Sequence, residues 1–364
     1  GFSFRDDFIP DYTWAAFHPA HFILPHLQLT QAGFDSWLTI NTVLPFGEDL
    51  SGILSEMKLA LEARATWLMT EKVDSSALMP VCPPPVDLHY PMSSETWQVM
   101  IDDAVSQMQA GEFRKVVLAR ASEIACGGTI QVGQALQFLD VHYPGCYRFL
   151  FEPQPRHAFI AATPELLVRI TGSSLVTMGL AGSIRRGSTP QEDAWLAEEM
   201  LDSPKERYEH RLVVDELRRR LQPQTIQLSA PTVPDVLRFR NIQHLHTPIH
   251  AELKRPAGVL RVLASLHPTP ALGGSPRTLA MEYIRRAEPV PRGWYAAPVG
   301  WLGPDLDGEF AVAIRSAVIQ EQRAWLYAGA GIVAGSQAEQ EWKETALKFK
   351  PILQALNVEG IVEA

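Results

Sequence analysis

Apolar residues recur every three to four positions in two long stretches of the chain, 94–110 and 336–356. This spacing places them on one face of a helix. Gly111 follows the first stretch as a suitable helix stop, and Pro351 lies inside the second as a site for a kink. The apolar positions are Trp97, Met100, Ala104, Val105 and Met108 in the first stretch and Trp342, Ala346, Phe349, Ile352, Leu353 and Leu356 in the second.

Two short motifs mark expected helix starts. The segment 203–206 combines a capping serine, a proline suited to the first turn and a glutamate that completes a capping box. The segment 336–339 repeats the spacing of serine and glutamate. We therefore expect a helix over 203–220 and another that begins at 336.

Short β-branched runs predict strands between these helices. The run 115–120 is one strand, and two hairpins are expected, one pairing 158–170 with 174–180 and the other pairing 309–319 with 324–330. Strands and helices are mixed and do not alternate regularly. The order therefore favours an α+β fold over a doubly wound sheet.

The composition is that of a globular protein. The 364 residues are 46% hydrophobic and 20% charged, which excludes a disordered or fibrous chain. The 32 Lys and Arg against 41 Asp and Glu give a net charge of −9, which argues against nucleic acid as a partner.

No run of about 18 apolar residues predicts a membrane span, and 1–30 show no secretory signal. Three widely spaced cysteines form no disulfide framework, so we expect a cytoplasmic protein.

Two pairs of glutamates have the same spacing. Glu206 and Glu209 lie three residues apart in one expected helix, and Glu341 and Glu344 do so in another. Each pair therefore lies on one helix face, and two such faces that meet would form a carboxylate cage for Mg²⁺. Each pair also has a purely structural explanation, because Glu206 fits the capping box and Glu344 can pair with Lys348 one turn later.

Arg315 lies among alanines on one face of the expected strand 309–319, opposite an apolar face. A long cation among small residues leaves room for a ligand, and a guanidinium can hold a carboxylate through two parallel hydrogen bonds. The alternative interpretation is an arginine on a solvated face of the sheet.

Ten short stretches, taken together, resemble the chorismate-utilising enzymes and, among them, the isochorismate synthases. They follow the order of that family. The resemblance implies a single large α+β domain over 1–364, with two stacked antiparallel sheets and outer helices, a variable portion at 1–90 and the motifs at 91–364. The ten stretches are 115–120, 162–167, 180–183, 203–210, 244–248, 266–274, 299–301, 313–315, 328–333 and 341–345.

The resemblance also implies a site for chorismate and Mg²⁺. Glu209 and Glu344 match the metal ligands, with Glu206 and Glu341 as outer neighbours, and the metal would hold the ring carboxylate. Arg315 matches the arginine that holds the pyruvyl carboxylate. The full set of implied substrate-binding positions is Gly182, Ser183, His244, Ala271, Leu272, Arg315, Gly329, Gly331 and Lys348.

The implied reaction adds water at C2 of chorismate while the C4 hydroxyl leaves. Glu165 matches the general acid, which must be protonated, and Lys115 matches the general base, which must be neutral. Without the resemblance, Lys115 would be interpreted as a lysine at a strand edge and Glu165 as a turn residue.

Two positions distinguish the subfamilies. Lys115 argues against anthranilate synthases, which generally carry Gln there and work with a glutaminase partner. Ala271 argues against salicylate synthases, which tend to carry Thr there.

We therefore expect a monomeric isochorismate synthase without a glutaminase subunit, which feeds menaquinone or catechol siderophore synthesis. A salicylate synthase, an amine-adding chorismate enzyme and a non-catalytic dicarboxylate-binding protein remain the alternatives.

Overall fold

The computed structural model describes residues 1–44, 47, 50–70 and 85–358, and these fall into two compact units. The smaller unit, within 21–70, contains a hairpin and one helix: β1 (Leu27–Ala32), β2 (Asp35–Ile40) and α1 (Leu50–Thr70). The larger unit contains 1–20 and 85–358. Residues 1–20 belong to the larger unit because the aromatic side chains of Phe4, Trp14 and Phe17 are buried in its core.

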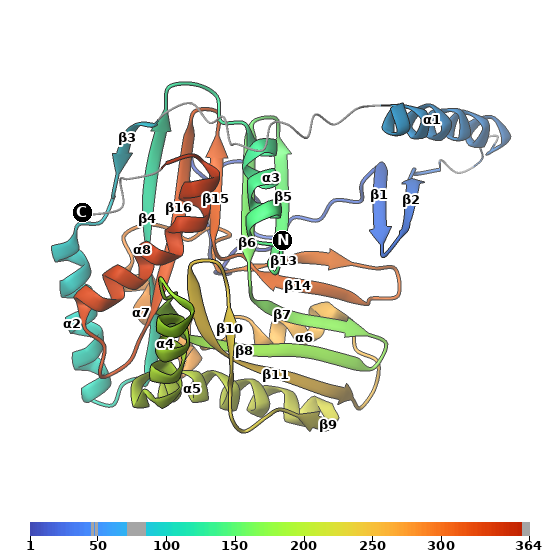
Figure 1. The fold of residues 1–364 in the computed structure, drawn as a ribbon. Helices are drawn as coiled ribbons and strands as arrows, with labels where there is room; N and C mark the ends of the chain where they lie inside the picture. The colour runs from blue at the N-terminus through green and yellow to red at the C-terminus, as the bar shows by residue number, and fades with distance from the viewer. Residues whose placement is uncertain (45–46, 48–49, 71–84, 359–364) are drawn as a thin grey trace. The chain divides into compact units, whose positions relative to one another are not determined.

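Two seven-stranded sheets form the larger unit, and all of their strand pairs are antiparallel (Figure 1). The first sheet has the order β12 (Gly274–Ser275), β4 (Lys115–Cys126), β16 (Arg323–Ile332), β15 (Ser316–Gln320), β6 (His157–Thr163) and β5 (Tyr147–Gln154), with β3 (Pro85–His89) also beside β4. The second has the order β10 (Asp235–Arg238), β11 (Ile242–Leu253), β8 (Ser174–Arg185), β7 (Leu166–Thr171), β14 (Gly308–Val312) and β13 (Pro298–Leu302), with β9 (Thr225–Ser229) also beside β11. The predicted α+β class with stacked antiparallel sheets is confirmed.

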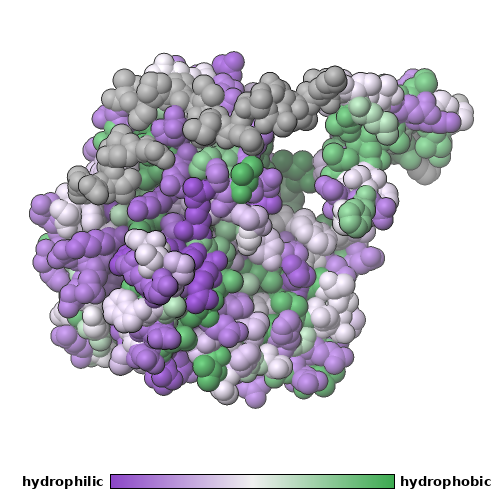
Figure 2. Space-filling model, in the orientation of Figure 1, coloured by the Kyte–Doolittle hydropathy of each residue, from purple (hydrophilic) through white to green (hydrophobic). Residues whose placement is uncertain are grey.

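Helices pack on both sheets. The first sheet contacts α2 (Ser94–Gln109), α3 (Val132–His142), α7 (Arg277–Ala287) and α8 (Ala338–Ala355), and the second contacts α4 (Pro190–Asp202), α5 (Pro204–Leu221) and α6 (Val259–Leu266). The short 3₁₀ turn Gln222–Gln224 follows α5. Figure 2 shows that the surface over α4, α5 and α8 is mainly hydrophilic. No helix of the described residues is long and apolar enough to cross a membrane.

The three expected helices form, but neither capping box does. Ser203 accepts a hydrogen bond from the N–H of Glu206, as predicted, yet its own N–H already donates to the carbonyl of Glu199 at the end of α4. The Glu206 carboxylate therefore turns to the N–H of Ser183 instead. Ser336 accepts from Val333, and α8 begins later without a side-chain cap.

Two of the expected strands change sheets partway along their length. The expected strand 158–170 is divided into β6 and β7. Pro164 lies at the break, where it has no N–H to donate to a ladder. The expected strand 309–319 is divided into β14 and β15, and Arg315 at the break has a φ of 53°, which few residues other than glycine adopt. Arg315 is only 6% exposed, so its interpretation as a solvated residue is wrong.

The two crossover points lie side by side. The N–H of Val312 donates to the carbonyl of Glu165 over 3.0 Å, and the N–H of Ala162 donates to the carbonyl of Arg315 over 3.1 Å. Backbone groups at the junction are thereby satisfied without a regular ladder. The arrangement brings one buried acid, Glu165, and one buried cation, Arg315, to the same place between the two sheets.

The proline-rich run 80–91 is only partly covered by the structure. Pro85–His89 forms β3 at the edge of the first sheet, and 80–84 lie outside the described residues. Cys126 and Cys146 are free thiols, and Cys82 also lies outside the described residues. Prolines permit a short strand of this kind at a sheet edge.

Candidate active site

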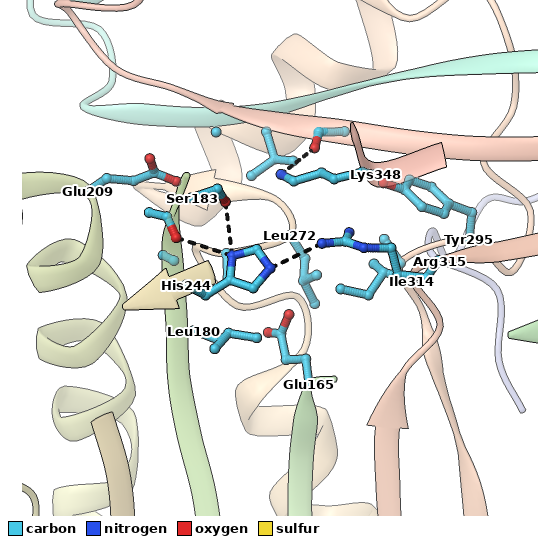
Figure 3. A pocket seen from close by; sticks show the side chains of 17 residues that line it. Glu165, Leu180, Ser183, Glu209, His244, Leu272, Tyr295, Ile314, Arg315 and Lys348 are labelled. Atoms are coloured by element: carbon cyan, nitrogen blue, oxygen red, sulfur yellow. Dashed lines mark hydrogen bonds between the residues drawn. The ribbon is translucent and has the colours of Figure 1, made fainter. Parts of the chain in front are cut away.

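One cavity between the two sheets collects the residues that the sequence singled out as substrate contacts (Figure 3). Strands β8, β11 and β16 contribute to its wall, as do helices α5 and α8 and the segments 271–272, 295–296 and 314–315. Glu165 and Glu209 also line it. All nine predicted substrate-binding positions are on this wall: Gly182, Ser183, His244, Ala271, Leu272, Arg315, Gly329, Gly331 and Lys348.

Sequence reasoning missed several lining residues, of which Tyr295 is the most polar. Its ring stacks on that of Tyr327 with centroids 5.5 Å apart, and burial raises the pKa of its hydroxyl to about 12. Tyr295 therefore offers a neutral O–H to the cavity. It precedes the matched stretch 299–301, and no spacing pattern marked it. The other missed residues are Val117, Leu180, Ala181, Ala296 and Ile314.

His244 joins Arg315 to the backbone of β8. An Nη2 group of Arg315 lies 3.1 Å from Nε2 of His244, and arginine can only donate, so Nε2 accepts. We therefore assign the proton to Nδ1, which lies 3.0 Å from Oγ of Ser183 and 3.2 Å from the carbonyl of Gly182. Burial, followed by the nearby cations Arg315 and Lys348, lowers the pKa of His244 well below its usual value, in agreement with a neutral ring.

Two cations on the wall differ in how they are held. Lys348 donates to the carbonyl of Gly329 over 2.8 Å and pairs with Glu344 at 2.5 Å, as predicted for one turn of helix. In the described part of the chain, no carboxylate lies within 4 Å of Arg315. In Figure 3, Arg315 and His244 lie between Lys348 on one side and Glu165 on the other. Arg315 is therefore a buried cation that still lacks an anionic partner.

We expect Arg315→Lys to weaken chorismate binding strongly although the charge is kept. A lysine would replace a planar fork with a point charge and lose the bond to His244. The KM for chorismate should rise about tenfold or more, as for the loss of a charge-assisted hydrogen bond of about 1.5–3 kcal/mol. Steady-state kinetics measure it, and Arg261→Lys, an exposed position on α6, serves as the control. Unchanged KM and kcat would place Arg315 outside the site.

Glu165 lies at the first crossover, with 5% of its surface exposed. Burial raises the pKa of its carboxyl to about 7, although the cations Lys115, Arg315 and Lys348 each act in the opposite direction. An ordinary glutamate has a pKa near 4.5 and is almost fully ionised at neutral pH. Glu165 instead retains a substantial protonated fraction there, which suits a general acid.

Lys115 is fully buried and does not itself line the cavity. Its Nζ lies 2.9 Å from Oε1 of Glu209, but it meets hydrogen-bond geometry with no described atom. Gly331 packs against both members of the pair with no side chain of its own, since a Cβ there would lie 2.1 Å from Glu209 Oε1 and 3.0 Å from Lys115 Cε. Glycine at 331 thus lets the lysine and the carboxylate reach the wall of the cavity.

The two glutamate pairs meet, as their spacing suggested. Burial, followed by the nearby carboxylate of Glu209, raises the pKa of Glu206 to about 7, with Glu344 acting in the same direction and Lys205 against it. Burial also raises the pKa of Glu341 to about 7, with Glu344 as the next cause. Glu206, Glu341 and Glu344 line a second hollow, which shares Ser183 with the cavity. The faces of α5 and α8 therefore converge on one carboxylate cluster.

Lysines neutralise much of this cluster. Lys205 lies 2.8 Å from Glu341 and 3.5 Å from Glu206, while Glu209 pairs with Lys115 and Glu344 with Lys348. Burial alone would lower the pKa of Lys205, but the surrounding carboxylates outweigh burial and raise it. Among the described residues, no three His, Cys, Asp or Glu side chains are arranged to hold a metal ion. Four carboxylates therefore lie beside three lysines.

Comparison with known proteins identifies the family. A family model described as "Chorismate binding enzyme" matches residues 1–357. The chain belongs to the chorismate-binding enzymes. The predicted resemblance is thereby confirmed at the level of the family.

This chorismate-binding enzyme is similar to several named proteins. It is 43% identical over 264 residues to the salicylate biosynthesis isochorismate synthase of Pseudomonas aeruginosa, which covers 72% of this chain and 55% of that protein. It is 34% identical over 360 residues to the isochorismate synthase MenF of Bacillus subtilis, which covers 99% of this chain and 74% of that one. The structure of the menaquinone-specific isochorismate synthase MenF from Escherichia coli superposes with a TM-score of 0.80 at 31% identity, covering 92% of this chain and 75% of that one.

Proposed function

We propose that this protein is an isochorismate synthase, an isomerase that converts chorismate to isochorismate. The names of its relatives support this activity. The observation that carries the proposal is the pairing, at one cavity, of a protonatable buried acid, Glu165, with the buried amine of Lys115 behind Gly331. Binding alone would need neither group. This argues against a non-catalytic dicarboxylate-binding protein.

Chorismate carries two carboxylates, and among the described residues the cavity offers an unpaired cation, Arg315, for one of them. Arg315 is buried, faces the cavity and has no carboxylate partner among the described residues, so it is the proposed partner of the pyruvyl carboxylate. The ring carboxylate would lie toward the carboxylate cluster, where a cation is needed between like charges. The neutral hydroxyl of Tyr295, which lies beside Arg315 (Figure 3), is an additional donor near the pyruvyl carboxylate.

In the proposed reaction, Lys115, which pairs as a cation with Glu209 in this structure, first loses its proton to solvent. The neutral amine then takes a proton from a water molecule as the water oxygen bonds to C2. The ring double bond shifts, and the bond between C4 and its hydroxyl oxygen breaks with its electron pair on that oxygen. Protonated Glu165 gives its proton to this oxygen, which leaves as water. One water enters and one leaves, so the product is an isomer of the substrate. In the reverse direction Glu165 acts as the base and protonated Lys115 as the acid.

The carboxylate cluster fits Mg²⁺ by the chemistry of its donors. Its ligand atoms are carboxylate oxygens, which hard divalent cations prefer, and their mutual repulsion is visible in the raised pKa values of Glu206 and Glu341. Glu209 and Glu344 would hold the ion, with Glu206 and Glu341 behind them. When bound, Mg²⁺ would supply the positive charge that the ring carboxylate of chorismate requires.

Two further points of the proposal concern products and use. Ala271 and Leu272 present only apolar side chains to the cavity, which favours release of isochorismate over the further elimination of pyruvate to salicylate. The relatives include enzymes named for salicylate, menaquinone and vibriobactin. We propose that the product serves menaquinone or siderophore synthesis.

Incubation with chorismate and Mg²⁺, followed by chromatography of the products, tests the function. Isochorismate as the product is expected. Salicylate would identify a salicylate synthase, and an aminated product formed only with an ammonium salt would identify an amine-adding enzyme. Unchanged chorismate would contradict the proposal.

We expect Glu209→Gln and Glu344→Gln each to lose most activity and to weaken Mg²⁺ binding, because each removes an anionic ligand. Isothermal titration with Mg²⁺ measures the binding, and a rise in affinity with bound chorismate is also expected. Glu339→Gln is the matched control, since Glu339 lies on α8 but is exposed and pairs only with Lys343. Normal Mg²⁺-dependent turnover in both variants would refute this ligand assignment.

A further inference from the structure

A buried ion pair that the sequence did not single out joins three segments behind the cavity. The side chains of Arg292 and Glu288 are 2% and 5% exposed and lie 2.5 Å apart. The guanidinium also donates through Nη1 to the carbonyl of Leu272 over 2.8 Å and through Nη2 to that of Val117 over 2.7 Å. The carboxylate in turn accepts the N–H of Ala119 over 2.8 Å.

The pair replaces a missing neighbour strand along one edge of β4. On this edge β12 pairs only as far as Val116, and β3 begins to pair at Glu123. Between these points Val117 and Ala119 would leave a carbonyl and an N–H buried without partners, which is energetically costly. Arg292 donates to the carbonyl of Val117, and Glu288 accepts from the N–H of Ala119. The two side chains therefore supply the hydrogen bonds that a neighbouring strand would otherwise make to this part of β4.

The groups held by this pair belong to the proposed active site. Val117 and Leu272 both line the cavity, and Lys115 lies two residues before Val117 on the same strand. The backbone carbonyl of Arg292 accepts the N–H of Tyr295, another lining residue. The guanidinium also lies over the ring of Phe4, 4.2 Å from its centroid, which excludes water from that side. The side chain of Arg292 therefore supports two walls of the cavity, and its backbone carbonyl supports a third.

We propose that Arg292, held by Glu288, is a positioning residue that keeps the strand of Lys115 and the loop of Leu272 at the spacing that the reaction needs. The proposal rests on the proposed function for its catalytic consequence. Only a planar guanidinium can pair with a carboxylate and reach two carbonyls in fixed directions at once. Lysine at this position would keep the charge and lose at least one of the carbonyl anchors.

The test compares Arg292→Lys with Arg220→Lys. Arg220 is a matched control, because it is also nearly buried, pairs with a glutamate and donates to the carbonyls of Leu266 and Pro268, neither of which lines the cavity. We expect Arg292→Lys to lower kcat/KM by about 10–100-fold, because small misplacements in an active site cost activity on this scale. The kcat/KM of Arg220→Lys should stay within about twofold of the parent enzyme, although the two variants lose a similar amount of Tm.

Hydrogen exchange provides a readout that does not depend on activity. Amides in 115–120 and 269–274 should exchange about tenfold faster or more in Arg292→Lys and remain unchanged in Arg220→Lys. Unchanged exchange in both segments, or an equal loss of kcat/KM in the two variants at equal Tm, would overturn the proposal. If the parent enzyme proves inactive with chorismate, the proposed function fails, while the exchange data still decide whether Arg292 holds these walls.

A second variant covers the case in which Arg292→Lys does not fold. Glu288→Gln keeps an oxygen that can accept the N–H of Ala119 but removes the charge that orients Arg292. We expect kcat/KM to fall at least about threefold. The pH at which kcat/KM falls on the alkaline side, where Glu165 loses its proton, should not change, because Glu288 does not contact that acid. A kcat/KM equal to that of the parent enzyme would contradict the positioning role.

Discussion

Glu165→Gln is expected to lower kcat for isochorismate formation by about 10²–10⁴-fold, the usual contribution of a general acid. The amide has nearly the same shape and fills the same buried space between β6 and β7, but it cannot deliver a proton to the C4 oxygen. Chorismate binding should survive, because Arg315 and the carboxylate cluster are unchanged. Product analysis and equilibrium binding of chorismate measure the two effects.

The pH dependence of the parent enzyme checks the same assignment. Burial raises the pKa of Glu165 to about 7, so the required protonated form is lost as the pH rises through this value. The kcat/KM should therefore fall on the alkaline side near pH 7, well above the 4.5 of an ordinary glutamate. Glu123→Gln, which removes a surface carboxylate paired with Arg323, should leave this limb in place. A Glu165→Gln variant with a near-parental rate would show that another group supplies the proton.

Lys115→Ala is expected to abolish water addition with a loss of similar size, about 10²–10⁴-fold, because no other lysine in the described part of the chain forms an ion pair with Glu209. This variant also leaves Glu209 without its partner in a buried position, so a lower Tm should accompany the loss of activity. Activity and stability must therefore be separated by a second substitution at the same position.

Lys115→Arg makes that separation. A guanidinium can still pair with Glu209, but it does not release its proton at any pH that the protein survives and so cannot act as a base. We expect a folded and nearly inactive protein, measured by Tm and by product formation at several pH values. Substantial activity in Lys115→Arg would exclude proton abstraction by this side chain. Gly331→Ala should also be inactive, since a Cβ at this position would collide with Glu209.

The sequence alone determined the local elements and most of the residues that line the cavity. Helical spacing and start signals predicted α2, α5 and α8, because both depend only on residues within a few turns. The i,i+3 spacing of the glutamates likewise placed each pair on one face. The nine substrate-binding positions came from short stretches in a family order, and the structure brings them onto one wall.

Tertiary structure decided how charges at these positions are neutralised. The spacing of Glu206 and Glu209 says nothing about Lys205, which reaches Glu341 on another helix. A buried carboxylate takes its partner from whichever chain segment packs against it, and that segment is 136 residues away. The capping box at 203–206 failed for the same reason, because Glu206 bonds to a strand that sequence reasoning could not place beside it.

The sheet crossovers were also decided only in three dimensions. A continuous apolar run predicts a strand but not the sheet that it joins, so 158–170 and 309–319 each looked like one strand. The breaks put Glu165 and Arg315 between the sheets. Arg292 carried no local signal at all, since its role is to satisfy backbone groups on a strand 175 residues away. The spacing of apolar residues indicates which side of a helix or strand is buried. The hydrogen-bond and ion-pair partners that lie far along the chain are decided by packing and by the need to satisfy every buried polar group.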